Sequence, residues 1–145
     1  MTVLSRGEAD TQSLATDLVP RLAVGDTVLL IGELGAGKTT LVRAMLAEWG
    51  WTGPVRSPTF NLIHVYATTP PVVHADLYRL PEGGAESTGL EEYLDSHVVL
   101  VEWPDRAAHL FDPVHVWRIR LEFALEQGPD ARRITVTPPR AKLGA

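Results

Sequence analysis

The stretch LLIGELGAGKTTLVRAM, residues 29–45, constrains the fold of this chain more than any other. It begins inside a short apolar run, residues 26–31, which predicts a β-strand. It continues into residues 38–49, which predict a helix that ends at Gly50. The turn between them reads GELGAGKT and fits the pattern G-x4-G-K-T. A strand, a glycine-rich turn and a helix in this order are typical of a loop that binds phosphate.

Each residue type in this loop has a physical task at a phosphate group. Glycines such as Gly32 and Gly37 let the backbone bring its N–H groups against phosphate oxygens. Lys38 is the only lysine in the first 141 residues, and it adds a positive charge at the β- and γ-phosphates. The Thr39 hydroxyl is placed to ligate Mg²⁺, and the helix that starts near Lys38 points its positive end at the same anion. The loop therefore predicts a nucleotide site.

Two acidic residues end apolar runs further along the chain. Asp76 ends VVHAD, and Glu102 ends VVLVE. The carboxyl ends of parallel strands converge where a nucleotide lies. One acid can therefore hold Mg²⁺ while the other orients the attacking water or senses the γ-phosphate. Considered without the loop, both acids could equally be surface carboxylates at strand ends.

The segment VRSPTFNLIHVY, residues 55–66, lies between the loop and these acids. Ser57 and Thr59 supply hydroxyls that could reach the γ-phosphate or a magnesium-bound water, as a switch segment would. An ordinary entry into a strand is an equal alternative. His74 is expected to pack in or beside the sheet, with a role near the nucleotide as the alternative.

The remaining patterns predict a mixed sheet covered by helices. Residues 10–24 carry leucines at helical spacing, but Pro20 should kink this helix or end it early. Apolar runs predict three further strands, at residues 59–66, 71–76 and 98–103. Residues 89–96 predict a short helix, and alternation from Trp117 onward with a turn at residues 126–131 predicts a hairpin. We expect buried parallel strands in the centre, an antiparallel pair at one edge and helices on the faces.

Composition limits the class of protein further. The chain has 145 residues, no cysteine and a formal net charge of -5, which argues against thiolate metal sites and against binding nucleic acid unaided. No apolar run reaches the roughly 18 residues of a membrane helix, and the first ten residues do not fit a secretory signal, so a cytoplasmic location is expected. A loose basic group near the carboxyl end could touch a polyanion or be a solvated chain end; it comprises Arg132, Arg133, Arg140 and Lys142.

Three classes of nucleotide-dependent function remain. A guanine-reading Asn-Lys-x-Asp segment cannot form. Asn61 is the only asparagine of the chain, and Lys142 is its only lysine besides Lys38. A small-molecule kinase needs a lid, for which only residues 78–89 are long and glycine-rich enough. An ATPase that acts on protein partners is favoured over this kinase, and a nucleotide-dependent binding module without useful hydrolysis is the third class.

Four motifs occur in order along the chain: GELGAGKTT, SPTF, HADLYRL and VVLVEWPDR. Together with GEADTQSLA before the first predicted helix, they span residues 7–106. In their order and spacing they resemble the bacterial TsaE-type ATPases, accessory subunits in the threonylcarbamoylation of adenosine 37 of tRNA. The resemblance implies a P-loop NTPase-like three-layer α/β sandwich, with a mixed, mostly parallel sheet and an antiparallel C-terminal hairpin.

The resemblance also implies ATP and Mg²⁺ as cofactors and assigns roles by position. The phosphates would be held by Gly35, Ala36, Gly37, Lys38, Thr39 and Thr40. Thr39 and Glu102 would hold Mg²⁺. Asp76 would be a second acid needed for hydrolysis, and Asp76, Glu102 and Lys38 would be the catalytic residues. Glu8 and Thr11 would approach the adenine.

The implied partners are the TsaD-type threonylcarbamoyl transferase subunit and its TsaB-type paralogue, with tRNA reached only through that complex and no membrane involved. Residues 1–137 would form the ATPase domain, and residues 138–145 a flexible tail. Whether Arg132 or Arg133 contacts nucleotide, partner or tRNA stays open.

Overall fold

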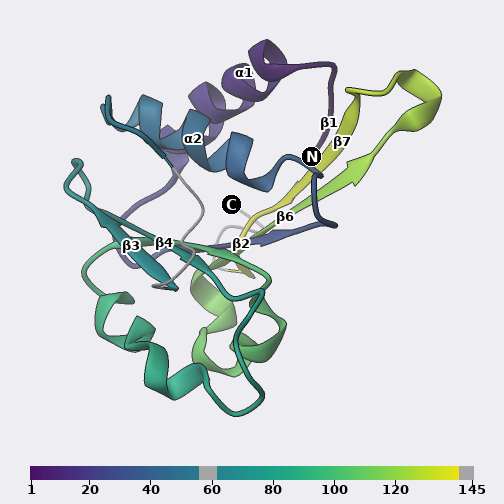
Figure 1. The fold of residues 1–145 in the computed structure, drawn as a ribbon. Helices are drawn as coiled ribbons and strands as arrows, with labels where there is room; N and C mark the ends of the chain where they lie inside the picture. Colours follow the sequence, from purple (N-terminus) through teal and green to yellow (C-terminus); the bar gives the residue numbers. More distant parts are fainter. Residues whose placement is uncertain (56–61, 141–145) are drawn as a thin grey trace.

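A computed structural model describes residues 1–55 and 62–140 of the chain. Within these residues a seven-stranded sheet has the order β1-β7-β6-β2-β5-β4-β3 (Figure 1). Its strands are β1 Thr2–Ser5, β2 Thr27–Ile31, β3 Ile63–Tyr66, β4 Val72–Asp76, β5 Val98–Glu102, β6 Val116–Phe123 and β7 Arg132–Thr137. The α-helices are α1 Glu8–Leu18 and α2 Lys38–Glu48. The 3-10 helices are Val19–Arg21, Ala85–Thr88, Leu90–Tyr93, Pro104–Arg106, Ala108–Leu110, Pro113–His115 and Leu125–Gln127.

The sheet is mixed, and most of its strands run in one direction. β6, β2, β5 and β4 pair in parallel, each with the next. β7 is antiparallel to β6, and β1 is antiparallel to β7, so β1 runs with the central strands. The mostly parallel sheet and the C-terminal hairpin are therefore confirmed. The expectation of antiparallel pairing at one edge was incomplete, because β3 also pairs antiparallel with β4 at the other edge.

One face of the sheet is covered by α1 and α2 (Figure 1). The helices bury apolar side chains against it, among them Leu14, Leu18, Leu41, Met45 and Leu46. α1 ends at Leu18, and the chain turns into a 3-10 helix that holds Pro20 in its first turn. Proline lacks the N–H that a continuing helix needs, so the predicted early end is confirmed.

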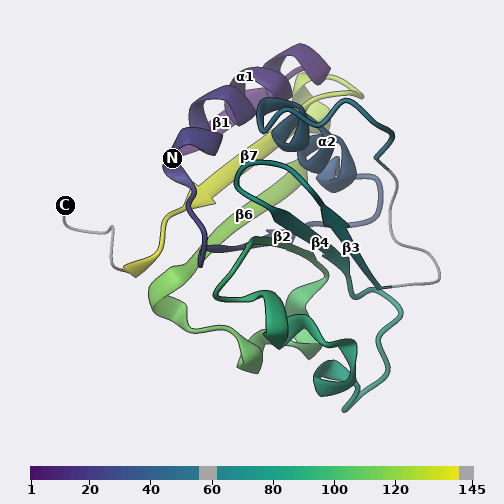
Figure 2. The ribbon, with the colours of Figure 1, turned by 90° about the vertical axis from the view of Figure 1, so that its left-hand side faces the viewer.

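Short 3-10 turns cover part of the opposite face (Figure 2). A second apolar cluster fills the space between them and the sheet, with Val73, Leu77, Leu90, Val101 and Phe111 among its members. The short helix predicted at residues 89–96 is the 3-10 helix Leu90–Tyr93. In the described residues no helix has both the length and the apolar character to span a membrane. The three-layer α/β arrangement is confirmed.

The topology places the ends of three parallel strands together. β2 leads directly into residues 32–37, which connect it to α2. β4 and β5 end at Asp76 and Glu102, and these two residues are register partners. Because β2, β5 and β4 are neighbours and run in the same direction, the loop and both acids lie at one edge of the sheet.

Candidate functional site

The loop between β2 and α2 depends on its glycines for its shape. Gly35 and Gly37 have φ angles of 81° and 102°, a region that residues with a Cβ rarely adopt. Gly37 is also the cap residue of α2, so backbone N–H groups at the start of the helix stay available for an anion. At Gly32 a Cβ would come within 2.6 Å of the Leu121 carbonyl oxygen. The loop therefore depends on glycine φ angles for its turn and packs directly against β6.

Lys38 is folded back over this loop. Its side chain is 5% exposed, and its Nζ donates hydrogen bonds to the carbonyl oxygens of Gly32 and Glu33. The same ammonium lies 3.7 Å from the centre of the Trp103 ring, a cation–π distance. Burial lowers the pKa of Lys38, while the carboxylates of Glu102 and Asp76 act in the opposite direction.

The loop and the two acids line one cavity of about 230 Å³, which we call the loop cavity. Its lining includes Lys38, Thr39, Thr40, Asp76, Glu102 and Trp103, with Gly35 and Gly37 from the loop. Asp76 accepts the backbone N–H of Tyr78 through Oδ1 at 3.1 Å. Burial raises the pKa of the Asp76 carboxyl, although that hydrogen bond lowers it in part. The side chains of a lysine, two threonines and two acids thus line the same small volume.

The side chain of Glu102 contacts the side chain of His74, which lies on the neighbouring strand β4. Nε2 of His74 lies 2.6 Å from Oε2 of Glu102, and both side chains are buried. His74 therefore packs inside the sheet, as expected, and it also contacts one of the two acids of the cavity.

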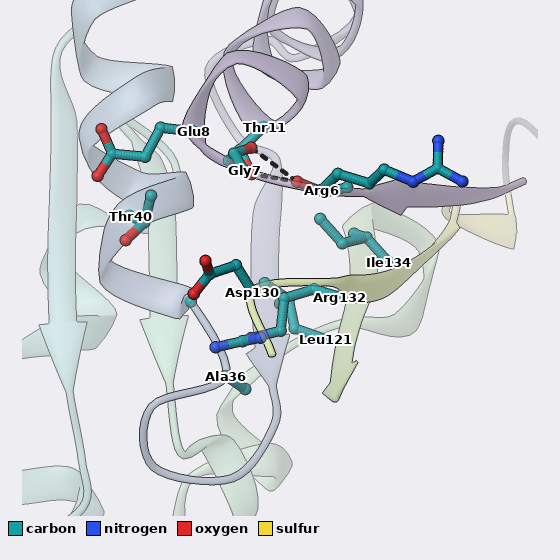
Figure 3. A pocket seen from close by; sticks show the side chains of 12 residues that line it. Arg6, Gly7, Glu8, Thr11, Ala36, Thr40, Leu121, Asp130, Arg132 and Ile134 are labelled. Carbon is teal, nitrogen blue, oxygen red and sulfur yellow. Dashed lines mark hydrogen bonds between the residues drawn. The ribbon is translucent and has the colours of Figure 1, made fainter. Parts of the chain in front are cut away.

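A second cavity of about 340 Å³ lies on the other side of the loop, and we call it the hairpin cavity. Its lining includes Glu8, Thr11, Ala36, Thr40, Asp130 and Arg132, together with Gly37. Figure 3 shows that these side chains come from α1, α2, the loop and the β6–β7 hairpin, and that Arg6 points away from them. Gly37 and Thr40 line both cavities, so the two lie next to each other along the start of α2.

Arg132 and Asp130 were not assigned to the site by the motifs. Nη2 of Arg132 donates to the Gly35 carbonyl oxygen at 3.3 Å, and its guanidinium lies 4.5 Å from the centre of the Phe123 ring. Arg133 points elsewhere and pairs with Glu126 at 2.6 Å. Neighbouring positions on a strand face opposite sides of the sheet, so the alternation of β7 was the signal that only one arginine could face the loop.

The structure brings the predicted site residues into these two cavities. The loop cavity holds Gly35, Gly37, Lys38, Thr39, Thr40, Asp76 and Glu102, and the hairpin cavity holds Glu8, Thr11 and Ala36. Thr11 is buried, and its hydroxyl is already within 2.9 Å of Ser5 Oγ. The predicted switch residues Ser57 and Thr59 lie outside the described residues. Residues 78–89, the candidate kinase lid, line neither cavity.

The donor set limits which metals the loop cavity can hold. No group of three or more His, Cys, Asp or Glu side chains with metal-binding geometry occurs in residues 1–55 and 62–140. A site with one protein carboxylate and one hydroxyl suits Mg²⁺, which is completed by waters and nucleotide phosphates. Thr39 and Glu102, which line the same cavity, fit that requirement.

Comparisons with known proteins agree with one another. A family model described as "Threonylcarbamoyl adenosine biosynthesis protein TsaE" matches residues 5–134. A relative from Streptomyces coelicolor, named tRNA threonylcarbamoyladenosine biosynthesis protein TsaE, is 37% identical over 132 residues and covers 87% of this chain and 88% of its own length. A relative of the same name from Aquifex aeolicus is 36% identical over 107 residues, covering 72% and 77%. The crystal structure of YdiB from Bacillus subtilis matches with a TM-score of 0.79 and 29% identity, over 96% of this chain and 85% of that one.

Proposed function

The chain belongs to the TsaE family, and on that premise we propose that it is a Mg²⁺-dependent ATPase that supports threonylcarbamoyladenosine formation at position 37 of tRNA. One observation carries this proposal. Lys38 and Thr39, at the start of α2, share a cavity with Asp76 and Glu102, at the ends of β4 and β5. A phosphate-binding loop, a metal-binding pair and a second acid are the parts that phosphoryl transfer to water requires.

Each part has a distinct role in the proposed reaction. The backbone N–H groups of residues 35–40 bind the phosphates, and Lys38 exchanges its carbonyl partners for β- and γ-phosphate oxygens. Thr39 and Glu102 hold Mg²⁺, which when bound neutralises charge on those oxygens. Asp76 orients the attacking water and accepts its hydrogen bond. Because burial raises the pKa of Asp76, this carboxylate is a stronger base than an exposed aspartate.

The hairpin cavity supplies the proposed site for the adenosine. Its carboxylates, Glu8 and Asp130, are acceptors for the exocyclic amine of adenine, whereas guanine presents a carbonyl oxygen at that position. Thr11 forms part of the same wall. Arg132 is fixed beside the loop by its hydrogen bond to Gly35, where a cation can contact the ribose or the α-phosphate. A carboxylate that meets the 6-position of the base would favour ATP over GTP.

The proposed partners are the TsaD-type transferase subunit and its TsaB-type paralogue. Exposed apolar side chains near the loop cavity, Leu34 at 63% and Tyr78 at 53% exposure, offer contact area to such a partner. The net charge of -5 fits a subunit that reaches tRNA only through the complex. A cytoplasmic location stays a prediction.

The proposal is tested by measuring ATP hydrolysis by the purified chain, alone and with the transferase pair. We expect association with the pair, faster hydrolysis in its presence and little phosphate release from the Asp76→Asn variant. Hydrolysis that is not stimulated, together with no association, would overturn the proposal. Phosphate transfer to a metabolite without any partner would favour the kinase alternative instead. Full support of tRNA modification by Asp76→Asn would favour a binding module.

A further inference from the structure

The buried contact between His74 and Glu102 is not explained by the roles proposed above. His74 lies in the middle of β4 and is 0% exposed, and Glu102 ends β5 and is 3% exposed. Their side chains meet across two parallel strands at 2.6 Å, which is short for a hydrogen bond from nitrogen to oxygen. His74 does not line the loop cavity, whereas Glu102 does. The histidine therefore contacts the acid from the side away from the cavity.

The surroundings of the ring indicate which nitrogen carries the proton. In the described part of the chain, Nδ1 of His74 is buried and has no hydrogen-bond partner. An N–H at Nδ1 would be buried without a partner, which costs about 1–3 kcal/mol. A ring protonated only on Nδ1 would bury that same N–H and also point a lone pair at the carboxylate. A hydrogen on Nε2 avoids that repulsion, and Nε2 then donates it to Oε2 of Glu102.

This hydrogen bond fixes a side chain that would otherwise have several rotamers. Glutamate has three rotatable bonds, and ordering it costs up to about 2 kcal/mol in conformational entropy. With Oε2 bound to His74, the carboxylate keeps one orientation whether or not the cavity is filled. The other oxygen, Oε1, is then left for a ligand in the loop cavity. The same division occurs in metal sites where an outer residue orients the ligand.

We infer that His74 is a positioning residue for the metal site: its Nε2–H holds Glu102 in the orientation in which this carboxylate meets Mg²⁺ beside Thr39. The inference rests on the proposed function, because it assumes that Glu102 holds the metal. His74 acts only through Glu102 and touches neither the nucleotide nor the reacting atoms. The histidine is thus part of the site because of its proton, not only because of its packing.

The test measures Mg²⁺ dependence of nucleotide binding, without reliance on turnover. ATP affinity is measured by calorimetry in EDTA and over a series of Mg²⁺ concentrations, for the unaltered protein, His74→Leu and His74→Gln. In His74→Leu we expect the Mg²⁺ concentration that gives half of the maximal change in ATP affinity to rise about 10- to 100-fold. Affinity in EDTA should stay close to that of the unaltered protein. His74→Gln, whose amide can donate from nearly the same place as Nε2, should restore most of the Mg²⁺ dependence.

Two further variants separate positioning from packing. His64, the register partner of His74 on β3, provides the matched control, and His64→Leu should leave the Mg²⁺ dependence unchanged. In a Glu102→Gln background, His74→Leu should have no additional effect, because the residue through which it acts no longer carries a charge. A lower Tm without a change in Mg²⁺ dependence would show that His74 only packs, and would overturn the inference.

A measurement on the unaltered protein covers the case in which His74→Leu does not fold. Long-range nitrogen–proton NMR of the imidazole should show a hydrogen on Nε2. An Nε2 without a hydrogen would overturn the inference. If the unaltered protein binds ATP without any Mg²⁺ dependence, the proposed function fails. If it shows that dependence and His74→Leu shows the same, only the role of His74 fails.

Discussion

Asp76 shows how a single residue can serve function at the expense of stability. Burial raises the pKa of its carboxyl above the ordinary value of 3.8, so the folded chain holds this proton to a higher pH than the unfolded chain does. Ionising Asp76 therefore costs folding free energy as the pH rises above its ordinary pKa. Above that ordinary pKa the folded protein is less stable because of a charge that the proposed reaction needs.

Replacing Asp76 with asparagine should therefore raise stability while lowering activity. At pH 7 we expect a Tm a few degrees above that of the unaltered protein, because the variant has no buried carboxylate to ionise. The difference should shrink as the pH falls towards 3.8, where the aspartate is protonated too. Thermal melts across this pH range, with ATP binding and hydrolysis at pH 7, measure these effects. An unchanged hydrolysis rate would show that Asp76 has no catalytic part, and a lower Tm at pH 7 would contradict the stability argument.

Removing the ammonium group of Lys38 should weaken the binding of ATP. Lys38→Met keeps an unbranched side chain over Trp103 but removes the ammonium, so ATP affinity should fall by about 1.5–3 kcal/mol, or roughly 10- to 150-fold. Equilibrium binding of ATP measures this loss. Arg43, exposed on the same helix, gives the control variant Arg43→Met, which should bind like the unaltered protein. Normal affinity in Lys38→Met would contradict the phosphate site.

At the scale of elements, the loop is fixed by its contact with β6. Gly32 approaches the Leu121 carbonyl so closely that a Cβ would lie 2.6 Å from that oxygen. Backbone atoms on both sides of the contact cannot rotate away, so a larger residue must displace the loop or the strand. The position of the backbone N–H groups that we propose bind phosphate therefore depends on the packing between residues 32–37 and β6.

Gly32→Ala should weaken both stability and nucleotide binding. We expect a loss of about 1–3 kcal/mol in the free energy of unfolding, the usual cost of overpacking, together with a weaker affinity for ATP. Urea melts and calorimetry measure the two effects. Gly7→Ala is the control for stability, since nothing lies within 4 Å of the added Cβ, and it should cost at most about 1 kcal/mol. Equal effects of the two substitutions would argue against the contact.

Local patterns were sufficient to predict most elements. The continuous apolar runs gave β2, β4 and β5, and the alternation from Trp117 onward gave β6. β1 was missed because its four residues, Thr2–Ser5, pair only with β7, with Thr2 opposite Thr135. No local signal reports a partner so distant in sequence.

The residues that line the candidate site could be predicted from local sequence patterns to the same extent as the helices and strands. Lys38 and Thr39 follow from a motif, and the acids follow from strand ends. The contact between His74 and Glu102 depends on the register of two strands, and Arg132 enters the hairpin cavity because the β6–β7 hairpin folds over the loop. These pairings are set by the assembled sheet, so the sequence alone could suggest a role for His74 but not its partner.

At the scale of the whole molecule, the two cavities should respond to nucleotide together. ATP with Mg²⁺ at 100 times its dissociation constant should stabilise the protein by about 2.7 kcal/mol, or roughly 5–11 °C in Tm for a domain of this size. GTP at the same concentration should give a smaller shift, because we propose that a carboxylate of Glu8 or Asp130 meets the 6-position of the base, where guanine has a carbonyl oxygen. Thermal melts with each nucleotide measure this, with Lys38→Met as the control, whose stabilisation by the same ATP concentration should fall to about 0.3–1.4 kcal/mol. Equal shifts for ATP and GTP would contradict the role given to the hairpin cavity.

The pairing of β1 with β7 has a consequence for the order of events in the cell. The hairpin cavity takes its walls from residues 5–11 and from residues 130–134 (Figure 3). A chain synthesised from its amino end has all of its loop-cavity residues once Trp103 has been added, yet the hairpin cavity, the proposed adenosine site, still lacks one wall. If the proposed adenosine site is right, a chain still being synthesised cannot bind ATP with full affinity until residue 134 has left the ribosome.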